Sequence, residues 1–458
     1  MYTTLTYNVD TDGIATITFN VADRPMNVLT PELLAEFAKA LETAVADSSV
    51  KGIILTSGKS SFIAGADLKD LVTAFDRGVT ASEGAAWSQS LSRLFRRIET
   101  CGKPVAAAVN GLALGGGLEM VLACHYRVMA DVKGCVIGLP EVKVGLLPGA
   151  GGTQRMLRIM GIAQAARTIT EGSNLLPADA LKFGVVHAIA PVNEVVDRAR
   201  AWLLTSPNAV APWDVKGFKV PGGSTITNPG VAQALMVGTA LISKATMRNY
   251  PAPHAILCAM YEGASLPMDK ALAVESKYFG QLLANPVARN LIRSMFINKG
   301  QLDKLSRRPT LPAKQKIERL GVLGAGMMGA GIAHVSAIAG ISVTLIDATI
   351  EQAQKGRQHA QSLLTREVEK GRRSTEEAAT VLARIEASTD FARLSDCDLV
   401  IEAVFEDRNV KADVTTRATA VMKKGSIFAS NTSTLPITGL AASAEHPTDF
   451  IGIHFFLR

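Results

Sequence analysis

The chain has 458 residues, of which 48% are apolar and 5% aromatic, and it carries a net charge of +7. This length suits roughly two to four domains, and the apolar content excludes an intrinsically disordered chain. The five cysteines are widely spaced and form no CxxC pair, so we expect a reducing compartment, no disulfide framework and no metal site. The first ten residues, MYTTLTYNVD, lack the features of a secretory signal, and we predict a cytoplasmic protein.

Strand and helix patterns alternate from the N-terminus to about residue 190, which predicts an α/β layered domain. The expected elements are strands at 13–20, 51–58 and 103–111 and helices at 30–46 and 87–99. The first helix has a suitable N-cap in Thr30 and a proline, Pro31, at its first position. The second helix is expected to turn Trp87 inward, on the same stripe as its other large apolar side chains.

A glycine-rich turn follows the third strand, in the sequence GLALGGGLE at 111–119. Backbone N–H groups at a helix start have no intrahelical partner, and without a Cβ at Gly116 a substrate oxygen can approach the main chain. A second turn, SSFIAGADLKD, is expected to supply another N–H group at Ala66. Two such donors form an oxyanion hole, where one donor is typically worth about 3–4 kcal/mol in the transition state.

Two glutamates accompany these turns. Glu119 lies in the first helical turn after the glycines, and Glu141 follows Pro140, where a strand gives way to a loop. The chain between them is long enough for the helix to end and a strand to return, so the carboxylates can face each other across a pocket. Such a pair can hold one water molecule and divide acid and base roles. The spacing alone favours simpler interpretations, a helix-dipole partner for Glu119 and a solvated side chain for Glu141.

The most apolar window, at 105–124, contains Asn110, Glu119 and several glycines. We therefore interpret it as a buried strand and a buried helix, and predict no integral membrane segment. Between about 190 and 310, apolar residues recur at helical spacing, which predicts a helical connecting region. The basic stretch at 304–316 has no interleaved aromatic residues, so we interpret it as a solvated linker and predict no nucleic-acid partner.

A second α/β domain is predicted to begin near residue 315, just before the sequence RLGVLGAGMMGAGIAHVSAIAGISVTLID. A strand precedes its GxGxxG run, a helix follows, and a second strand ends at Asp347. The glycines permit a tight turn and the approach of a pyrophosphate, and an acid about 20 residues further on binds a ribose hydroxyl. Asp347 favours NAD over NADP, because a 2′-phosphate would meet like charge. The predicted cofactor residues here are Gly324, Gly326, Met328, Gly329 and Asp347.

The motifs AGADLK, NGLALGGGLE, GLPEVKVGLLPGAGGTQR and ALKFGVVHAIAP resemble the enoyl-CoA hydratase (crotonase) family, in order, over about residues 10–190. The resemblance implies a spiral of ββα turns that binds coenzyme A thioesters. It implies that the N–H groups of Ala66 and Gly116 hold the thioester oxygen. It also implies that Glu119 and Glu141 add water across a trans-2-enoyl-CoA, and because both are present, hydration is favoured over other reactions of the family.

The segments DLVIEAVFEDRNVK, SIFASNTSTL and FIGIHFF resemble the NAD domain of the 3-hydroxyacyl-CoA dehydrogenase family. The resemblance implies that Glu406 and Lys411 lie at the cofactor. It implies that Ser433 contacts the substrate or nicotinamide and that His454 takes the hydroxyl proton during hydride transfer. Without the resemblance, the apolar residues around His454 favour a core histidine on a strand. The family continues with a carboxylate that orients this histidine, whereas this sequence stops at Arg458, so we expect weak or absent dehydrogenation by the chain alone.

The chain places the hydratase-like segment before the dehydrogenase-like segment. This order resembles the α-subunit family of bacterial fatty-acid oxidation complexes. The resemblance implies a β-oxidation enzyme with an acyl-CoA substrate, NAD as cofactor and a thiolase β-subunit as a candidate partner. The expected domains are an α/β crotonase-like spiral at 1–190, a helical linker at 191–314 and an incomplete Rossmann-type NAD domain at 315–458. Two alternatives stay open: an acyl-CoA- and NAD-binding protein without turnover, and a Δ3-Δ2-enoyl-CoA isomerase acting at the same site.

Overall fold

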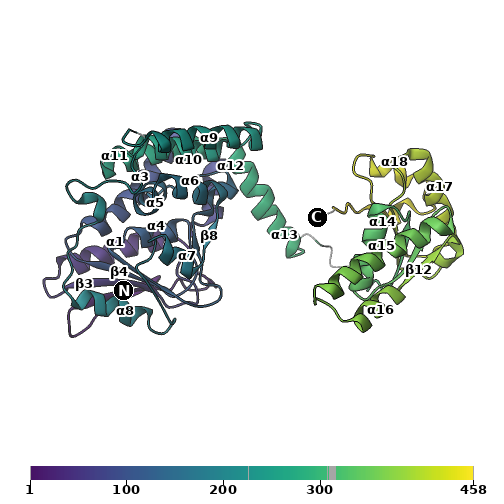
Figure 1. The fold of residues 1–458 in the computed structure, drawn as a ribbon, viewed down its shortest axis with the longest axis horizontal. Helices are drawn as coiled ribbons and strands as arrows, with labels where there is room; N and C mark the ends of the chain where they lie inside the picture. The colour runs from purple at the N-terminus through teal and green to yellow at the C-terminus, as the bar shows by residue number, and fades with distance from the viewer. Residues whose placement is uncertain (1, 225, 307, 309–315, 457–458) are drawn as a thin grey trace. The chain divides into compact units, whose positions relative to one another are not determined.

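The computed structural model describes residues 2–224, 226–306, 308 and 316–456. The chain divides into two compact units, Met1–Arg308 and Pro309–Arg458, and each is described by itself (Figure 1). The boundary predicted at residue 314 and the final Leu457-Arg458 lie outside the described residues. The predicted domain boundaries stay a prediction.

The first unit is built on a six-stranded sheet in the order β1-β2-β3-β4-β6-β9, in which only β1 and β2 pair antiparallel. A smaller sheet has the order β5-β7-β8. The strand predicted at 13–20 is β2, and its apolar side chains are buried as expected. The strands are β1 (Leu5–Val9), β2 (Ile14–Phe19), β3 (Gly52–Ser57), β4 (Val105–Val109), β5 (Ala113–Leu114), β6 (Tyr126–Ala130), β7 (Ile137–Gly138), β8 (Asn174–Leu175) and β9 (Ala188–Ala190).

The helices between these strands begin at recognisable caps. Thr30 caps α1 as predicted, accepting a hydrogen bond from the N–H of Leu33 at 3.2 Å. α3 begins earlier than predicted, because Thr80 and Glu83 form a capping box. The inward orientation predicted for Trp87 is wrong, since this side chain is 41% exposed. The helices are α1 (Pro31–Ala46), α2 (Leu68–Asp76), α3 (Ala81–Thr100), α4 (Gly116–Leu122), the 3₁₀-helix η1 (Pro140–Val144), α5 (Gly152–Met160), α6 (Ile162–Glu171) and α7 (Pro177–Lys182).

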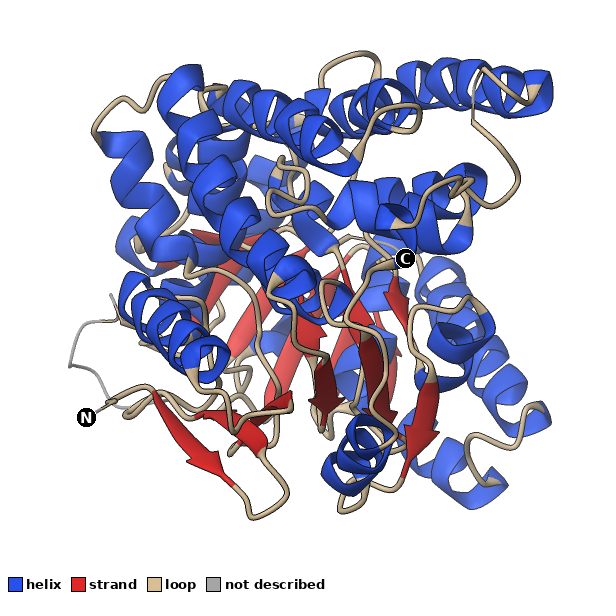
Figure 2. Cartoon of the chain, turned by 90° about the vertical axis from the view of Figure 1, so that its left-hand side faces the viewer, coloured by secondary structure: helices blue, strands red, loops and turns tan. Residues whose placement is uncertain are grey.

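The helical region predicted between 190 and 310 is confirmed, and its helices pack within the first unit. α11 lies against α3 and α5, and α10 lies against α5 and α6. In Figure 2 a layer of helices lies above the strands, on the side where Figure 1 places α9, α10 and α11. The elements are α8 (Val195–Leu204), η2 (Pro212–Asp214), α9 (Pro229–Thr246), α10 (Pro251–Gly263), α11 (Met268–Leu283), α12 (Pro286–Leu291), the π-helix η3 (Ile292–Asn298) and α13 (Lys299–Asp303).

The second unit has a parallel six-stranded sheet in the order β12-β11-β10-β13-β14-β15. The order reverses direction between β10 and β13, which is where open α/β sheets bind ligands. The strands are β10 (Arg319–Leu323), β11 (Ser342–Ile346), β12 (Ile385–Ser388), β13 (Leu399–Glu402), β14 (Ile427–Ser430) and β15 (Phe450–Gly452). The helices are α14 (Met327–Ile338), α15 (Ile350–Glu369), α16 (Thr375–Ala383), η4 (Phe391–Leu394), α17 (Arg408–Thr419), α18 (Ile437–Ala441) and η5 (Pro447–Asp449).

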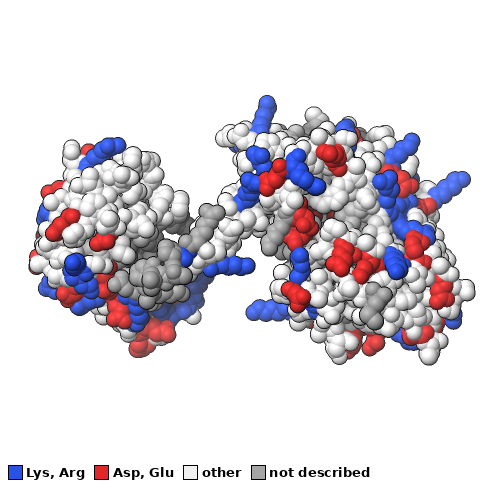
Figure 3. Space-filling view, turned by 180° about the vertical axis from the view of Figure 1, so that it is seen from behind, with Lys and Arg blue, Asp and Glu red and all other residues white. Residues whose placement is uncertain are grey.

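The apolar window at 105–124 folds as β4, β5 and α4, with nearly all of its side chains buried, as we predicted. Among the described residues, no helix combines the length and apolar character needed to cross a bilayer. On the face shown in Figure 3, basic and acidic side chains are interspersed on each unit. Because its side chains are buried, the window at 105–124 stabilises the core of the first unit.

Candidate active site

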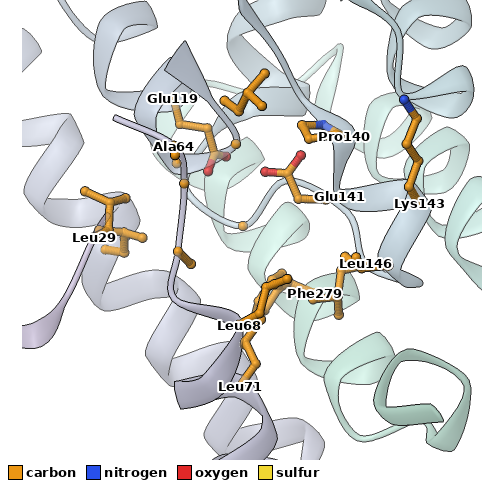
Figure 4. Close-up of a pocket in the computed structure, with 18 of the residues that line it drawn as sticks. Leu29, Ala64, Leu68, Leu71, Glu119, Pro140, Glu141, Lys143, Leu146 and Phe279 are labelled. Carbon is orange, nitrogen blue, oxygen red and sulfur yellow. The ribbon is translucent and has the colours of Figure 1, made fainter. Parts of the chain in front are cut away.

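A cavity of about 430 Å³ in the first unit brings the predicted hydratase residues together. Figure 4 shows the carboxyl groups of Glu119 and Glu141 turned toward each other in it. The rest of the wall is mostly apolar. The lining residues are Leu29, Ala64, Gly65, Ala66, Leu68, Leu71, Trp87, Ser88, Leu91, Leu114, Gly115, Gly116, Glu119, Pro140, Glu141, Lys143, Val144, Leu146, Gly149, Asn174, Phe279 and Phe296.

The glycine turn before α4 is shaped by close approach. Gly115 has φ +54°, a conformation that favours glycine, and a Cβ on it would lie 2.8 Å from Glu141 Oε1. A Cβ on Gly116 would lie 2.4 Å from the Leu29 side chain. Gly116 is the first residue of α4, so its N–H group has no partner within the helix. Ala66 forms an isolated parallel β-bridge with Leu29 and lines the same cavity, so the two predicted oxyanion donors share one space.

The carboxyl group of Glu119 is held in place by main-chain donors. It is 2% exposed, and its Oε1 accepts hydrogen bonds from the N–H groups of Ala150 at 2.7 Å and Gly152 at 2.8 Å. Burial raises the pKa of Glu119, while these two N–H groups and the guanidinium of Arg155 oppose the rise. Its second oxygen is left for a ligand in the cavity.

The carboxyl group of Glu141 differs from that of Glu119 in its hydrogen bonding. Its Oε2 is buried and has no hydrogen-bond partner among the described residues. Burial, followed by the charge of Glu119, raises the pKa of Glu141 well above its ordinary value. Its backbone lies in η1, so the loop predicted after Pro140 is a 3₁₀-helix, and the solvated side chain weighed as an alternative is wrong. Glu141 is therefore the better proton donor of the pair and Glu119 the better acceptor.

A smaller cavity of about 240 Å³ in the second unit gathers five of the predicted dehydrogenase residues, together with four others. Ser433 and His454 are exposed at this cavity, so the alternative of a core histidine is wrong. His454 follows the end of β15, and its ring centroid lies 4.3 Å from that of Phe456. The lining residues are Met328, Ala403, Val404, Glu406, Lys411, Asn431, Ser433, His454 and Phe455.

The remaining predicted cofactor residues lie at the turn from β10 to α14. Gly324 has φ +92°, and a Cβ on Gly329 would lie 1.7 Å from the Gly324 carbonyl oxygen. Gly326 precedes α14, and a Cβ there would meet no atom within 4 Å. Asp347 Oδ2 accepts a hydrogen bond from the N–H of Ala325 at 2.6 Å. A tight turn, an open helix start and an adjacent carboxylate fit a dinucleotide.

Lys411 is held by a residue that we did not predict. Its Nζ lies 3.0 and 2.9 Å from the two carboxylate oxygens of Glu402 and 3.2 Å from Glu406 Oε2. A carboxylate inside the apolar strand sequence DLVIEA was the available signal, since a buried carboxylate needs a partner. Partial burial raises the pKa of Glu406, but hydrogen bonds from Thr432 and Lys411 outweigh it and lower this pKa to about 2.

Glu275 is a second residue that the sequence did not reveal as part of a site. It lies on α11, is fully buried and bonds the turn that also holds Glu119. The signal was a glutamate between Leu272 and Phe279, on the buried stripe of an amphipathic helix. A charged residue at such a position requires buried donors.

Comparison with known proteins assigns families to both units. Residues 10–211 match the family described as enoyl-CoA hydratase/isomerase, and residues 319–457 match the 3-hydroxyacyl-CoA dehydrogenase NAD binding domain. The fatty acid oxidation complex subunit alpha of Pseudomonas syringae pv. syringae is 37% identical over 97% of this chain and 61% of that protein. The subunit of the same name from Shewanella amazonensis is 36% identical over 97% of this chain and 62% of that protein.

A crystal structure of (S)-3-hydroxybutyryl-CoA dehydrogenase from Ralstonia eutropha is 38% identical, covering 31% of this chain and 50% of that chain, with a TM-score of 0.30. The chain spans about 61% of the length of the curated relatives it matches. It therefore joins an enoyl-CoA hydratase/isomerase domain to a 3-hydroxyacyl-CoA dehydrogenase NAD-binding domain, and it is a homologue of the alpha subunits of fatty acid oxidation complexes.

Proposed function

We propose that the first unit hydrates trans-2-enoyl-CoA to 3-hydroxyacyl-CoA in fatty-acid β-oxidation. The observation that carries the proposal is the pair of buried carboxyl groups in one cavity with opposite hydrogen-bonding states. Glu119 accepts two N–H bonds, which favour its ionised form, whereas Glu141 Oε2 is buried and finds no partner in the part of the chain that the structure describes. One base and one acid facing the same space suit the addition of water across a double bond.

The proposed reaction moves two protons. Glu119 takes a proton from a water molecule, whose oxygen forms a bond to C3 of the enoyl group. Electrons move from the double bond toward the thioester oxygen, which accepts hydrogen bonds from the N–H groups of Ala66 and Gly116. Glu141 then donates its proton to C2 and becomes a carboxylate. Transfer of the proton from Glu119 back to Glu141 restores the starting state.

Crotonyl-CoA consumption by the full chain tests this proposal. We expect Glu119→Gln and Glu141→Gln each to lower kcat by about 10²–10⁴-fold, because each removes one proton-transfer group. Glu36→Gln is a matched control, since Glu36 also accepts backbone N–H bonds but does not line the cavity. Equal activity in wild type and both active-site variants would contradict hydration by this pair, and no consumption by any of the three would favour a binding protein.

The same cavity also suits Δ3-Δ2-enoyl-CoA isomerisation. Glu141 has one oxygen free, and a single carboxyl group can move a proton along an acyl chain. A 3-enoyl-CoA substrate separates the reactions, because isomerisation needs no water. We expect isomerisation to depend on Glu141 and to survive Glu119→Gln better than hydration does.

We propose that the second unit binds NAD, as its match to the 3-hydroxyacyl-CoA dehydrogenase NAD binding domain supports. NAD, when bound, supplies the hydride acceptor. The glycine turn and Asp347 would hold the dinucleotide, and Glu406 would present a fixed negative charge. His454 would take the hydroxyl proton, with Ser433 beside it at the cavity. Calorimetric titration with NAD tests this: we expect Asp347→Ala to weaken binding at least tenfold, and unchanged affinity would contradict the assignment.

We also propose a cytoplasmic location and a thiolase β-subunit as partner. The support for a partner is the name of the relatives, which are alpha subunits of a complex. Size-exclusion chromatography of the chain with a thiolase from the same cell tests the partnership. A shared peak is expected, and separate elution at micromolar concentrations would contradict it.

A further inference from the structure

Glu275 is a buried carboxyl group that the proposed mechanism does not use. It is 0% exposed, and it is not among the residues that line the cavity. Its Oε1 accepts a hydrogen bond from the N–H of Gly151 at 2.5 Å. Its Oε2 accepts from the N–H of Thr153 at 2.8 Å and from the Thr153 hydroxyl at 2.5 Å. All three partners are donors, which is the environment of a carboxylate.

The turn at 150–153 supplies four successive N–H groups that alternate between two carboxylates. The first and third, from Ala150 and Gly152, bond Glu119. The second and fourth bond Glu275. α5 begins in this turn and has no side-chain N-cap. Since the first N–H groups of a helix need external acceptors, the two glutamates together take the place of that cap.

The turn is fixed from its other side as well. Gly151 has φ +103°, and a Cβ on it would lie 1.8 Å from Arg155 Nη1. The same Nη1 donates to the carbonyl oxygen of Ala150 at 2.7 Å, and Arg155 Nε donates to Glu99 at 2.7 Å. The N–H groups that bond Glu119 can therefore move only if the bonds to Glu275 or Arg155 also change.

We propose that Glu275 is a positioning residue for Glu119. By fixing the alternate N–H groups of the turn at 150–153, it sets where the catalytic carboxylate sits and how strongly its charge is stabilised. The inference rests on the proposed function for its effect on turnover, but not for its effect on Glu119 itself. Glu275 is thus a second contribution of α11 to the site, beside Phe279, which lines the cavity.

Several charged side chains lie near Glu119 and Glu275. The charged groups around this pair are Glu141 on η1, Arg155 and Arg158 on α5 and, through Arg155, Glu99 on α3. Burial and then the charge of Glu119 raise the pKa of Glu275. Replacing Glu275 by glutamine removes carboxylate acceptors from the N–H groups of Gly151 and Thr153, which weakens the hold on the neighbouring N–H groups that bond Glu119, so the pKa of Glu119 should rise.

The primary test follows Glu119 by NMR of the full chain labelled with ¹³C at the glutamate carboxyl carbon. Glu119→Gln assigns the resonance. In Glu275→Gln we expect the titration midpoint of Glu119 to rise by about one pH unit, because the N–H bonds that favour its ionised form weaken. Glu36→Gln is the control, because Glu36 also accepts bonds from two backbone N–H groups and from threonine hydroxyls, yet lies outside the cavity. An unchanged midpoint in folded Glu275→Gln overturns the inference.

Wild-type protein supplies a test that does not depend on the variant folding. Two interacting carboxyl groups titrate in coupled steps, so the curves of Glu119 and Glu275 should each inflect at the other's midpoint. Independent single-step curves overturn the inference.

Turnover gives the second readout. We expect Glu275→Gln to lower kcat for crotonyl-CoA by roughly 10- to 100-fold and to leave KM within about twofold, because it displaces the base but not the acyl wall. A merely structural role would reduce the yield of folded enzyme without moving the Glu119 midpoint. If wild type hydrates no enoyl-CoA, the proposed function fails and the NMR result still decides the role of Glu275.

Discussion

The two units hold buried carboxyl groups in different ways. In the first unit, Glu119 and Glu275 are bonded by main-chain N–H groups, and burial raises their pKa values. In the second, Glu402 pairs directly with the ammonium group of Lys411, which also lies beside Glu406. Main-chain donors satisfy a carboxylate without cancelling its charge, so it can still exchange protons. A cation fixes the charge, which suits recognition of a ligand rather than proton transfer.

Removing the cation from the second unit should give the largest effect on stability. Lys411→Met leaves the carboxylate of Glu402 buried and unpaired, since both side chains are about 98–99% inaccessible. We expect a loss of about 3–5 kcal/mol in the free energy of unfolding, measured in urea. Lys423→Met is the matched control, because its ion pair with Asp398 is partly exposed and worth less than about 1 kcal/mol. Equal losses would contradict the contrast between the units.

In the first unit, geometry should matter more than charge. Gly115→Ala places a Cβ 2.8 Å from Glu141 Oε1 at a residue with φ +54°. We expect hydration of crotonyl-CoA to fall by about 100-fold, because a displacement of about 1 Å has such effects. Gly78→Ala is the control, since it has φ +74° but no atom within 4 Å of the added Cβ. Similar losses in both variants would show that backbone strain alone is responsible.

The smallest predicted effects concern the pH dependence of stability, which should have opposite signs for Glu141 in the first unit and Glu406 in the second. Because the pKa of Glu141 is raised, the folded state binds more protons than the unfolded state, and stability falls as pH rises above the ordinary value of 4.5. Glu141→Gln escapes this loss, so its Tm relative to wild type should rise by about 2–4 °C between pH 5 and pH 8.

Glu406 should show the opposite dependence. Its pKa is lowered to about 2, so its stabilisation is present above 4.5 and is lost as pH falls toward 2. Glu406→Gln should therefore lower Tm at pH 8, and the difference should shrink as the pH falls below 4.5. Parallel pH profiles for these two variants would contradict the contrast.

Local signals in the sequence predicted much of both sites. The glycines before α4 and α14, and the cap at Thr30, act through the backbone near them, so their roles can be recognised from nearby residues. Trp87 was wrongly placed because helical periodicity does not distinguish a core from the wall of a cavity. η1 was missed because it has only five residues and no side-chain N-cap, although Pro140 at its start and Gly145 after its end were available signals.

The residues that support the sites could not be placed from the sequence. Glu275 acts on a turn more than a hundred residues earlier in the chain, through the packing of α11 on α5. Glu402 was not predicted: its position in an apolar strand was a signal, but its partner, Lys411, is presented by α17. Such pairings depend on tertiary packing, which local patterns do not specify.

The most direct test of the central claim is a double-mutant cycle on Glu119 and Glu141, read as kcat/KM for crotonyl-CoA. If the two act on one water molecule, either Gln substitution should remove most of the rate enhancement. The double variant should then be no more than about tenfold slower than the slower single variant. Losses that multiply across the cycle would show that the glutamates act independently, and would contradict the account.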